Sequence, residues 1–326
     1  MTIRIICPAG AGSRSGNRTT ATRWARILRV LGHRVSVATG YASERCDLLV
    51  AMHARRSFQS VRAFSSLHPR LPLIVALTGT DLYGDIRSSR RARRSLELAT
   101  RLIVLQPLGV RELPRRLRPK VRVMYQSAAP LTKRAGRTGS FDVCVIANLR
   151  AVKDPLRAAL AVRYLPPTSR IRVLHFGRAI SEALGHKARA EAQRNPRYQW
   201  LGEQPHWQVR GALARSQLLV LSSRTEGGAN VISEALAAEV PILATRIPGN
   251  MGLLGTRYPG MFPVGAAQAL ARLMWRAESN KKCYAELARA CAQRAYLCRP
   301  EREHRAWAEL LKEVAAAPRP GRQTTA

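Results

Sequence analysis

Two glutamates with seven residues between them, Glu226 and Glu234, stand out in the second half of the chain. Gly227 and Gly228 follow the first glutamate and predict a turn that a ligand can approach closely. The apolar spacing over 229–239 then predicts a helix, whose first N–H groups and dipole favour a phosphate. Carboxylates accept hydrogen bonds from sugar hydroxyls, so the pattern predicts a site for a sugar or nucleotide phosphate. The alternative is structural: Glu226 caps the helix and Glu234 lies on its solvated face.

A second candidate element contains a lysine, which is a rare residue in this chain. The segment after the strand-like run 141–147 includes Arg150 and Lys153, and only seven lysines occur among the 55 basic residues. Two cations after a predicted strand would lie where such sheets bind ligands, beyond the carboxyl ends of the strands. For both residues the alternative is an ordinary solvated surface cation.

The first half of the chain offers a loop suited to an oxyanion. Residues 8–18 are rich in glycine, basic, and followed by a helical pattern. Such a loop presents backbone N–H groups to an anion. The residues that could bind the anion are Gly12, Gly16, Asn17 and Arg18. Their spacing is not the dinucleotide fingerprint Gly-x-Gly-x-x-Gly, and the alternative is a plain flexible loop.

Three further polar side chains follow apolar runs of the first half, namely His53, Thr80 and Asp81. Asp81 could orient a sugar or act as a base, and the alternative is a helix N-cap for the stretch that starts at Leu82. His53 is either a satisfied structural histidine or a residue of a cleft, and His206 is expected to cap or pack a helix. No set of His, Cys, Asp and Glu has the spacing of metal ligands, so we expect no bound metal and no cofactor.

The elements that must position these residues alternate between short apolar runs and longer amphipathic stretches, which is typical of an α/β protein with parallel sheets. The predicted strands of the first half are 2–7, 34–39, 46–52, 72–78, 101–105 and 121–126. A helix is predicted after Gly16, with its end at Gly32. The predicted strands of the second half are 141–147, 170–176, 198–201, 217–221 and 240–244. The predicted helices there are 155–164, 180–193, 205–214, 229–239, 265–277 and 281–294, followed by a last one near 301–315.

The domain organisation follows from a break in this pattern. Residues 127–140 lose all periodicity and are predicted to form an interdomain linker. We therefore expect two doubly wound, Rossmann-like domains, 1–132 and 141–298, facing a cleft at the carboxyl ends of their strands. The helix 300–315 is expected to pack back on the first domain, and 316–326 to form a disordered tail.

The charge balance favours anionic partners. The 326 residues contain 55 Lys+Arg and 20 Asp+Glu, a formal net charge of +35, and both halves are basic. The arginines are nevertheless spread over the chain and no nucleic-acid motif occurs, so we expect no nucleic-acid partner. A nicotinamide-dependent oxidoreductase would need the glycine fingerprint and an acid after the second strand, where residues 39–41 read Thr-Gly-Tyr.

Location is predicted from the apolar runs and the cysteines. No apolar run approaches the ~20 residues that span a bilayer, and the chain begins directly with a strand-like run rather than a signal peptide. The six cysteines include no Cys-x-x-Cys pair, as expected for reduced thiols. We therefore expect a cytoplasmic protein without membrane insertion, and the oligomeric state stays open.

The Glu-x7-Glu element, together with Ala-Leu-Ala-Ala-Glu-Val-Pro-Ile-Leu-Ala after it, resembles the donor site of family-4 glycosyltransferases of the GT-B fold. The resemblance implies that Glu234 binds the ribose of a nucleotide sugar and that Glu226 contacts the transferred hexose. It also implies that the sugar and diphosphate are lined by Glu226, Gly227, Gly228, Ala229 and Asn230. A short turn at Gly202 resembles the loop against which the nucleobase docks.

The diphosphate-binding cations of that family are matched in part. Lys153 stands where the family has a lysine on the donor diphosphate. The family's arginine, five residues earlier, is Asn148 here, and Arg150 is the substitute that the resemblance suggests.

Several stretches resemble one subgroup more closely, the selenosugar synthases of selenoneine biosynthesis, over about residues 2–312. They include Gly16-Asn17-Arg18-Thr19-Thr20-Ala21, Ala51-Met52-His53-Ala54-Arg55-Arg56-Ser57, Leu77-Thr78-Gly79-Thr80-Asp81-Leu82-Tyr83, Asn195-Pro196-Arg197-Tyr198-Gln199-Trp200-Leu201-Gly202-Glu203 and Arg246-Ile247-Pro248-Gly249. This resemblance implies a reaction between selenophosphate and a UDP-hexose, UDP-N-acetylglucosamine or UDP-glucose, that forms a C–Se bond and releases UDP and phosphate.

The catalytic residues under this hypothesis are Lys153, Glu226 and Asp81, without a metal. The acceptor would bind in the first domain, at Gly12, Gly16, Asn17, Arg18, His53, Thr80 and Asp81. The alternative is a family-4 glycosyltransferase with an ordinary hydroxyl acceptor.

Overall fold

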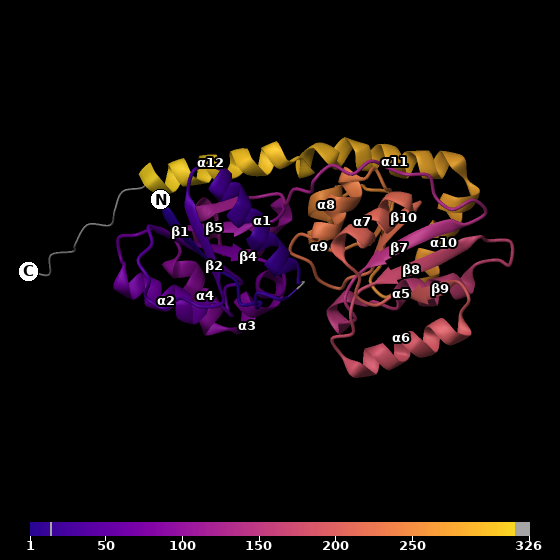
Figure 1. Ribbon diagram of the computed structural model, residues 1–326, viewed down its shortest axis with the longest axis horizontal. Coiled ribbons are helices and arrows are strands. Elements are labelled where there is room, and N and C mark those ends of the chain that lie inside the picture. Colours follow the sequence, from indigo (N-terminus) through magenta and orange to yellow (C-terminus); the bar gives the residue numbers. More distant parts are fainter. Residues whose placement is uncertain (14, 317–326) are drawn as a thin grey trace, which may run out of the picture. The chain divides into compact units, whose positions relative to one another are not determined.

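The computed structural model describes residues 1–13 and 15–316, and the chain divides into two compact units (Figure 1). Unit 1 combines Met1–Gln126 with the C-terminal segment that starts at Pro300, and unit 2 is Ser127–Arg299. The predicted tail 316–326 lies, beyond Ala316, outside the described residues.

Unit 1 is built on a six-stranded parallel sheet in the order β2-β1-β3-β4-β5-β6. Its strands are β1 (Thr2–Ile6), β2 (Arg34–Ala38), β3 (Leu48–Met52), β4 (Leu73–Leu77), β5 (Arg101–Val104) and β6 (Val121–Val123). In register, Ile5 of β1 lies opposite Val37 of β2 and Val50 of β3. Every residue of β3 and β4 is buried, as expected for central strands covered by helices on both faces. These helices are α1 (Gly16–Val30), α2 (Phe58–Leu67), α3 (Ile86–Ser88), α4 (Arg90–Leu98) and α12 (Pro300–Ala316).

Unit 2 repeats this plan with the order β12-β11-β10-β7-β8-β9, again all parallel. Its strands are β7 (Phe141–Ile146), β8 (Ile171–Phe176), β9 (Tyr198–Trp200), β10 (Leu218–Leu221), β11 (Ile242–Thr245) and β12 (Met261–Phe262). Its helices are α5 (Arg157–Ala161), α6 (Glu182–Arg194), α7 (His206–Arg215), α8 (Asn230–Ala237), α9 (Pro248–Leu254), α10 (Ala267–Ser279) and α11 (Lys281–Ala295). The strand order changes direction between β7 and β10, the kind of switch point where doubly wound sheets bind ligands.

The strands β1 to β10 lie within the predicted runs, β11 ends one residue beyond the predicted 240–244, and the predicted α/β class is confirmed. The end predicted for the first helix is also confirmed, because Gly32 has φ +85° and its N–H bonds to Arg29 O at 2.9 Å. The structure adds α2, α4, α9 and β12 to the elements named from the sequence. The strand β12 has only two residues, too few for a periodic signal, and the Pro248-Gly249 pair at the start of α9 looks like a turn in the sequence.

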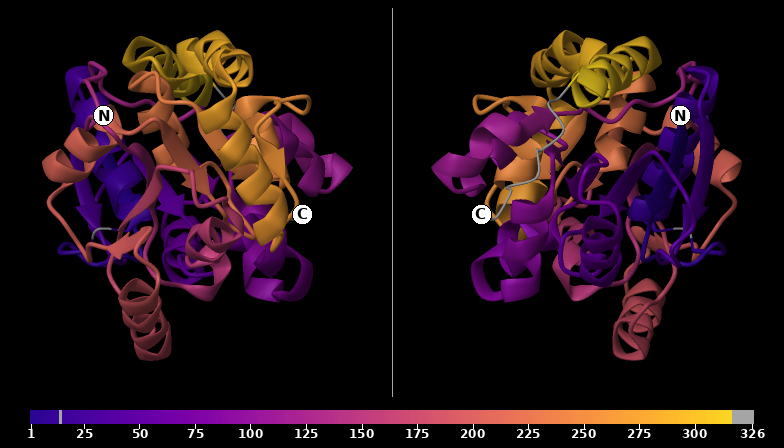
Figure 2. Two further views of the ribbon diagram at one scale, coloured as in Figure 1. Left: turned by 90° about the vertical axis from the view of Figure 1, so that its right-hand side faces the viewer. Right: turned by 90° about the vertical axis from the view of Figure 1, so that its left-hand side faces the viewer.

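The C-terminal helix α12 packs on α1 within unit 1 (Figure 2, where α12 is yellow). The rings of Trp24 and Trp307 meet edge to face with centroids 5.1 Å apart, and both side chains are fully buried. Glu303, also buried, accepts hydrogen bonds from Trp24 Nε1 at 2.7 Å and Arg23 Nε at 2.9 Å. The buried charge is thus paired, as a carboxylate in a core must be.

The segment 127–140, predicted as a linker, has no regular secondary structure and belongs to unit 2. Its backbone is held along α7: Arg134 N donates to Ala214 O at 2.9 Å, and Arg210 Nη2 donates to Ala129 O at 2.9 Å. Ala128 N also donates to Cys298 O at 3.0 Å. These bonds attach the segment to unit 2, which composition alone does not indicate.

Candidate functional site

The donor candidates of unit 2 come together after two adjacent strands. The strands β7 and β10 are neighbours and parallel, so the loops that follow them meet at one edge of the sheet. Lys153 ends a short 3-10 turn, Ala151–Lys153, in the first loop, and Glu226 lies in the second. Their charged groups are in contact, with Nζ 2.5 Å from Oε1. The structure therefore pairs two residues that are 73 positions apart in the sequence.

Backbone and side-chain hydrogen bonds fasten these two loops to each other. Arg224 N donates to Val152 O at 2.8 Å, and Ser222 Oγ donates to Asp154 O at 2.8 Å. Asp154 adopts the left-handed conformation with φ +44°, and its carboxylate forms a two-pronged ion pair with Arg157 at 2.9 and 3.2 Å. A non-glycine residue in this conformation is uncommon and occurs where surrounding contacts hold it. These bonds hold the two loops together and so fix the positions of Lys153 and Glu226.

Glu226 is almost buried, with 8% of its surface exposed. A β-carbon added to Gly249, near the start of α9, would lie 1.9 Å from Glu226 O, well inside contact distance. Only glycine at 249 therefore allows the α9 backbone to approach the loop so closely. The helix-cap alternative for Glu226 is wrong, because Ala229 is the N-cap residue of α8 and the Glu226 carboxylate pairs with Lys153.

The helix α8 starts at Asn230, directly after Gly227, Gly228 and Ala229. Its N-cap residue is alanine, which has no side-chain oxygen to accept the first helical N–H groups, and its first turn contains no acid. The positive end of the helix dipole is therefore not countered by a carboxylate within α8's first turn. Such a helix start can accept an anion.

Glu234 lies just over one turn into α8. Its side chain is 15% exposed, and Oε1 is 3.1 Å from His206 Nε2 on α7. This hydrogen bond raises the pKa of His206, and burial acts against it. The solvated-face alternative for Glu234 is therefore wrong. His206, expected from the sequence to cap or pack a helix, is the first residue of α7 after the N-cap Pro205, and its ring contacts Glu234 on α8.

Two glycines shape the rim next to this site. Gly177, after β8, has φ +147°, and a β-carbon there would lie 2.1 Å from Ala147 O. Gly177 N donates to the carbonyl of Gly202, which has φ +67°. Asn148 Oδ1 accepts from Arg178 N at 3.1 Å and so ties the β7 loop to the β8 loop. Arg150 lies exposed before the turn that carries Lys153.

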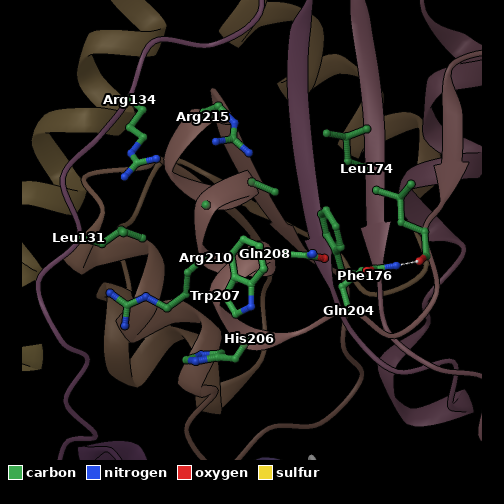
Figure 3. Close-up of a pocket in the computed structure, with 13 residues that line it drawn as sticks. Leu131, Arg134, Leu174, Phe176, Gln204, His206, Trp207, Gln208, Arg210 and Arg215 are labelled. Carbon is green, nitrogen blue, oxygen red and sulfur yellow. Dashed lines mark hydrogen bonds between the residues drawn. The ribbon is translucent and has the colours of Figure 1, made fainter.

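A cavity of about 780 Å³ lies between α7 and β8, beside His206 (Figure 3). Its wall combines apolar side chains from the sheet with arginines from α7 and the 127–140 segment. The lining includes Leu131, Arg134, Leu174, Phe176, Leu201, Gln204, His206, Trp207, Arg210 and Arg215. Gln204 Nε2 donates to Leu201 O at 2.7 Å at one end of the cavity.

The acceptor candidates lie in unit 1, also after strands. Asn17 Nδ2 on α1 donates to Thr78 Oγ1 after β4 at 3.2 Å, which joins the glycine-rich loop to the Thr78–Asp81 loop. Gly16 is the first residue of α1, and the N-cap Ser15 accepts from Arg18 N at 3.4 Å. A β-carbon on Gly12 would meet nothing within 4 Å. Residue 14 of this loop lies outside the described residues.

His53 and Asp81 form the centre of this second group. His53 is buried in the left-handed conformation, φ +72°, with Nε2 3.1 Å from Thr80 Oγ1. Burial lowers the pKa of His53. Asp81 is fully buried and accepts from the backbone N–H groups of Ala54, Thr78 and Gly79, each at 2.9 Å. Its carboxylate therefore joins the ends of β3 and β4.

The N-cap alternative for Asp81 is wrong, because Asp81 begins a π-helical turn, Asp81–Asp85, and the N-cap residue is Thr80. Three backbone donors occupy its two oxygens, which is the arrangement of a structural anchor. The expected role of Asp81 toward substrate stays a prediction, as do those of the other site residues.

The sequence interpretation missed several residues that shape unit 2's site: Asp154, Ser222, His206 and Gly249. Ser222 and Asp154 stand beside predicted site residues, so adjacency was the available signal. His206 and Gly249 act across helices, and only the strand order brings them to the site.

Within residues 1–13 and 15–316, no group of three or more His, Cys, Asp or Glu side chains could hold a metal ion. All six cysteines lie in that part of the chain and are free thiols. No described helix is both long and apolar enough to cross a bilayer.

Comparisons with known proteins match this architecture. The model of the family "Glycosyl transferases group 1" matches residues 132–297, half of the chain. "Glycosyltransferase 1 domain-containing protein 1" of Xenopus tropicalis is 25% identical over 311 residues, 86% of this chain and 90% of that protein.

Solved structures show the same fold at low identity. Anabaena Alr3699/HepE, in complex with UDP and glucose, has a TM-score of 0.76 at 16% identity and covers 96% of this chain and 100% of its own. Sucrose-phosphate synthase of Thermosynechococcus elongatus has a TM-score of 0.75 at 15% identity, covering 97% and 100%. The predicted GT-B fold class is confirmed. On the family match over unit 2, the chain belongs to the group 1 glycosyl transferases.

Proposed function

We propose that this glycosyltransferase uses a UDP-hexose as donor, bound at the edge of unit 2's sheet. The observation that carries the proposal is the Lys153–Glu226 pair, fixed beside the start of α8. The cation and the helix dipole suit a diphosphate, and the two glutamates suit hydroxyls of sugar and ribose. The structural relative HepE, whose complexes contain UDP with glucose and UDP-glucose, supports the choice of nucleotide.

In this proposal, Lys153 and the first N–H groups of α8 stabilise the charge that develops on the departing diphosphate. Arg150, exposed and three residues before Lys153 in the same loop, adds a second cation. Gly202 faces the nucleobase, Glu234 the ribose, and Glu226 the hexose. The chain's own cations provide the electrostatic stabilisation, so the proposed chemistry requires no metal or other cofactor.

The acceptor that we propose is selenophosphate, on the resemblance of the Gly16–Ala21 and Leu77–Tyr83 stretches to selenosugar synthases. A selenium lone pair forms the C–Se bond at the anomeric carbon while the C–O bond breaks and its electron pair leaves on UDP. Any proton on selenium goes to solvent. Water then cleaves the Se–P bond, giving a selenohexose and phosphate. Selenium is soft and already anionic, so a strong general base is less necessary than for a sugar hydroxyl.

The alternative function is transfer of the hexose to an ordinary hydroxyl acceptor. The observation that favours it is the family match itself, which supports a glycosyl transferase without specifying the acceptor. Under either function we place the protein in the cytoplasm, which the six free thiols support.

One experiment separates the two functions. The protein is incubated with UDP-glucose or UDP-N-acetylglucosamine and either selenophosphate or a panel of sugar acceptors, and products are identified by mass spectrometry. Release of UDP with a selenium-containing hexose supports the selenosugar proposal. Release of UDP only with a carbohydrate acceptor supports the alternative, and no binding of any UDP-sugar contradicts both.

A further inference from the structure

The contact between His206 and Glu234 has a geometry that an incidental surface pair lacks. His206 is the first residue of α7, and its Nε2 reaches across to Oε1 of Glu234 on α8 at 3.1 Å. The histidine side chain is 64% exposed, whereas the glutamate side chain is 15% exposed. A solvent-accessible donor thus fixes a carboxylate that is largely enclosed.

We propose that His206 is a positioning residue, which holds the Glu234 carboxylate in the orientation that binds the ribose hydroxyls of the donor nucleotide. The inference rests on the proposed function, in which Glu234 faces the ribose. It assigns to His206 a part in recognising ribonucleotides that no comparison with known proteins gives it.

The acceptor capacity of the carboxylate allows both contacts at once. A carboxylate offers two oxygens with about four lone-pair sites, and His206 uses one of them. Among the described residues, Oε2 of Glu234 receives no hydrogen bond, so it is available to a ribose hydroxyl. Without His206, the flexible glutamate side chain would have to be ordered by the ligand itself, which weakens binding.

The charges around the pair are consistent with this role. Arg210, one turn further along α7, is the other charged group acting on His206, and it disfavours a second positive charge there. On the side of Glu234, burial raises the pKa of the Cys144 thiol on β7, and the negative charge of Glu234 raises it further. The imidazolium and the neutral tautomer with a proton on Nε2 can both donate to Glu234, so the hydrogen bond does not depend on full protonation.

A second His–Glu pair in the same unit provides the matched control. His186 and Glu182 lie four residues apart on α6 at 3.6 Å, and both side chains are exposed, 65% for the histidine and 89% for the glutamate. This pair has the same two residue types as His206–Glu234 and nearly the same histidine exposure. Both of its residues, however, lie on one helix, and its carboxylate is exposed. His186→Ala therefore reports what the loss of a surface histidine does by itself.

The test compares UDP with 2′-deoxy-UDP, using calorimetry for the dissociation constants and steady-state kinetics with a UDP-sugar. His206→Ala should weaken UDP binding and raise the donor KM by about 2- to 12-fold, the equivalent of one net hydrogen bond. It should leave kcat within about twofold, because uniform binding is lost rather than transition-state stabilisation. It should also reduce the preference for UDP over 2′-deoxy-UDP. His206→Gln keeps an N–H donor at a similar reach, so it should keep most of the wild-type UDP affinity and of the preference for UDP over 2′-deoxy-UDP. His186→Ala should change neither the affinity nor the preference.

A double-mutant cycle identifies the route of the effect. In the Glu234→Ala background the preference for UDP over 2′-deoxy-UDP should be small. Adding His206→Ala should not weaken UDP binding further. The inference is overturned, while the proposed function stands, if the His206→Ala protein has the thermal stability of the wild type and keeps the wild-type preference for UDP over 2′-deoxy-UDP. The same holds if its effect adds fully to that of Glu234→Ala. If the wild-type protein binds no UDP, the proposed function and this inference both fail, and that result is read before any variant is made.

Discussion

Lys153 and Glu226 form an ion pair, with Nζ 2.5 Å from Oε1. The pair is unequal, because the glutamate side chain is 9% exposed and the lysine side chain 27%. The lysine therefore compensates a charge that the fold has largely removed from water. Substitutions at either residue will affect both the stability of the loops and their chemistry, and the two effects must be separated.

We predict that Lys153→Ala lowers kcat about 100-fold, as expected for loss of one group that stabilises a developing anion. The donor KM should change much less, because the interaction strengthens mainly as the diphosphate departs. The same variant should lose about 1–3 kcal/mol of unfolding free energy, since Glu226 stays buried without its partner. Kinetics with a UDP-sugar and urea denaturation measure the two losses.

The double variant Lys153→Ala/Glu226→Gln separates the loss of kcat from the loss of unfolding free energy. It should regain much of the lost stability, because a neutral amide replaces the unpaired carboxylate, and it should stay inactive. Lys187→Ala, at an exposed lysine of α6, is the matched control and should behave as the wild type. A Lys153→Ala protein with wild-type kcat would remove Lys153 from the proposed chemistry.

Gly249→Ala should weaken donor binding although residue 249 has no predicted contact with the donor. The added methyl group would lie 1.9 Å from Glu226 O, so either the Glu226 loop or the start of α9 must move. We expect a loss of about 1–3 kcal/mol in stability and a rise in the dissociation constant for UDP, measured by denaturation and calorimetry.

Gly211→Ala on α7 is the control for this prediction. Its β-carbon would meet only the end of the Arg215 side chain at 3.8 Å, an ordinary contact. Because alanine is favoured over glycine inside a helix, this variant should be unchanged or about 0.5–1 kcal/mol more stable. Equal UDP affinity in both variants would show that the close approach of α9 does not shape the donor site.

The strands and the Glu-x7-Glu element could be predicted because their signals are local. Short apolar runs locate β3 and β4, and the Gly227-Gly228 turn before an apolar helix locates the site on its loop. The partners of those residues could not be predicted, because the contacts Lys153–Glu226 and His206–Glu234 depend on the strand order and on helix packing. Asp81 shows the same limit: its sequence context suggested a cap or a base, and three backbone donors from two loops define its surroundings.

Trp307→Ala should destabilise unit 1 by about 3–5 kcal/mol. Trp307 on α12 is fully buried and meets Trp24 on α1 at 5.1 Å, so its removal leaves a large cavity between the two helices. Trp207→Ala is the control, because that tryptophan is 73% exposed on α7 and should change stability by less than about 0.5 kcal/mol. Urea denaturation with hydrogen exchange on α1 peptides checks both, and equal midpoints for the two variants would show that α12 contributes little to the core.

Unit 2 should lose stability as the pH falls from about 6.5 to 4, because of His175. Burial lowers the pKa of His175 to about 4, while an unfolded histidine titrates near 6.5. Between these values the unfolded chain binds a proton that the folded chain does not, so stability decreases as pH falls, by about 3 kcal/mol in total, and is fully present above pH 6.5.

The neutral imidazole of His175 is hydrogen-bonded beside the loop that follows β7. Its ring nitrogens lie 2.8 Å from Tyr198 Oη and 2.8 Å from Ala147 O, at the start of the loop that carries Lys153. His175→Phe loses these bonds and is less stable at every pH, but it has no group to titrate there. The free energy of opening of β7 and β8, followed by hydrogen exchange between pH 7 and 4.5, should therefore fall less steeply in the variant. Parallel pH profiles for the two proteins would show that His175 is not the buried base that limits acid stability.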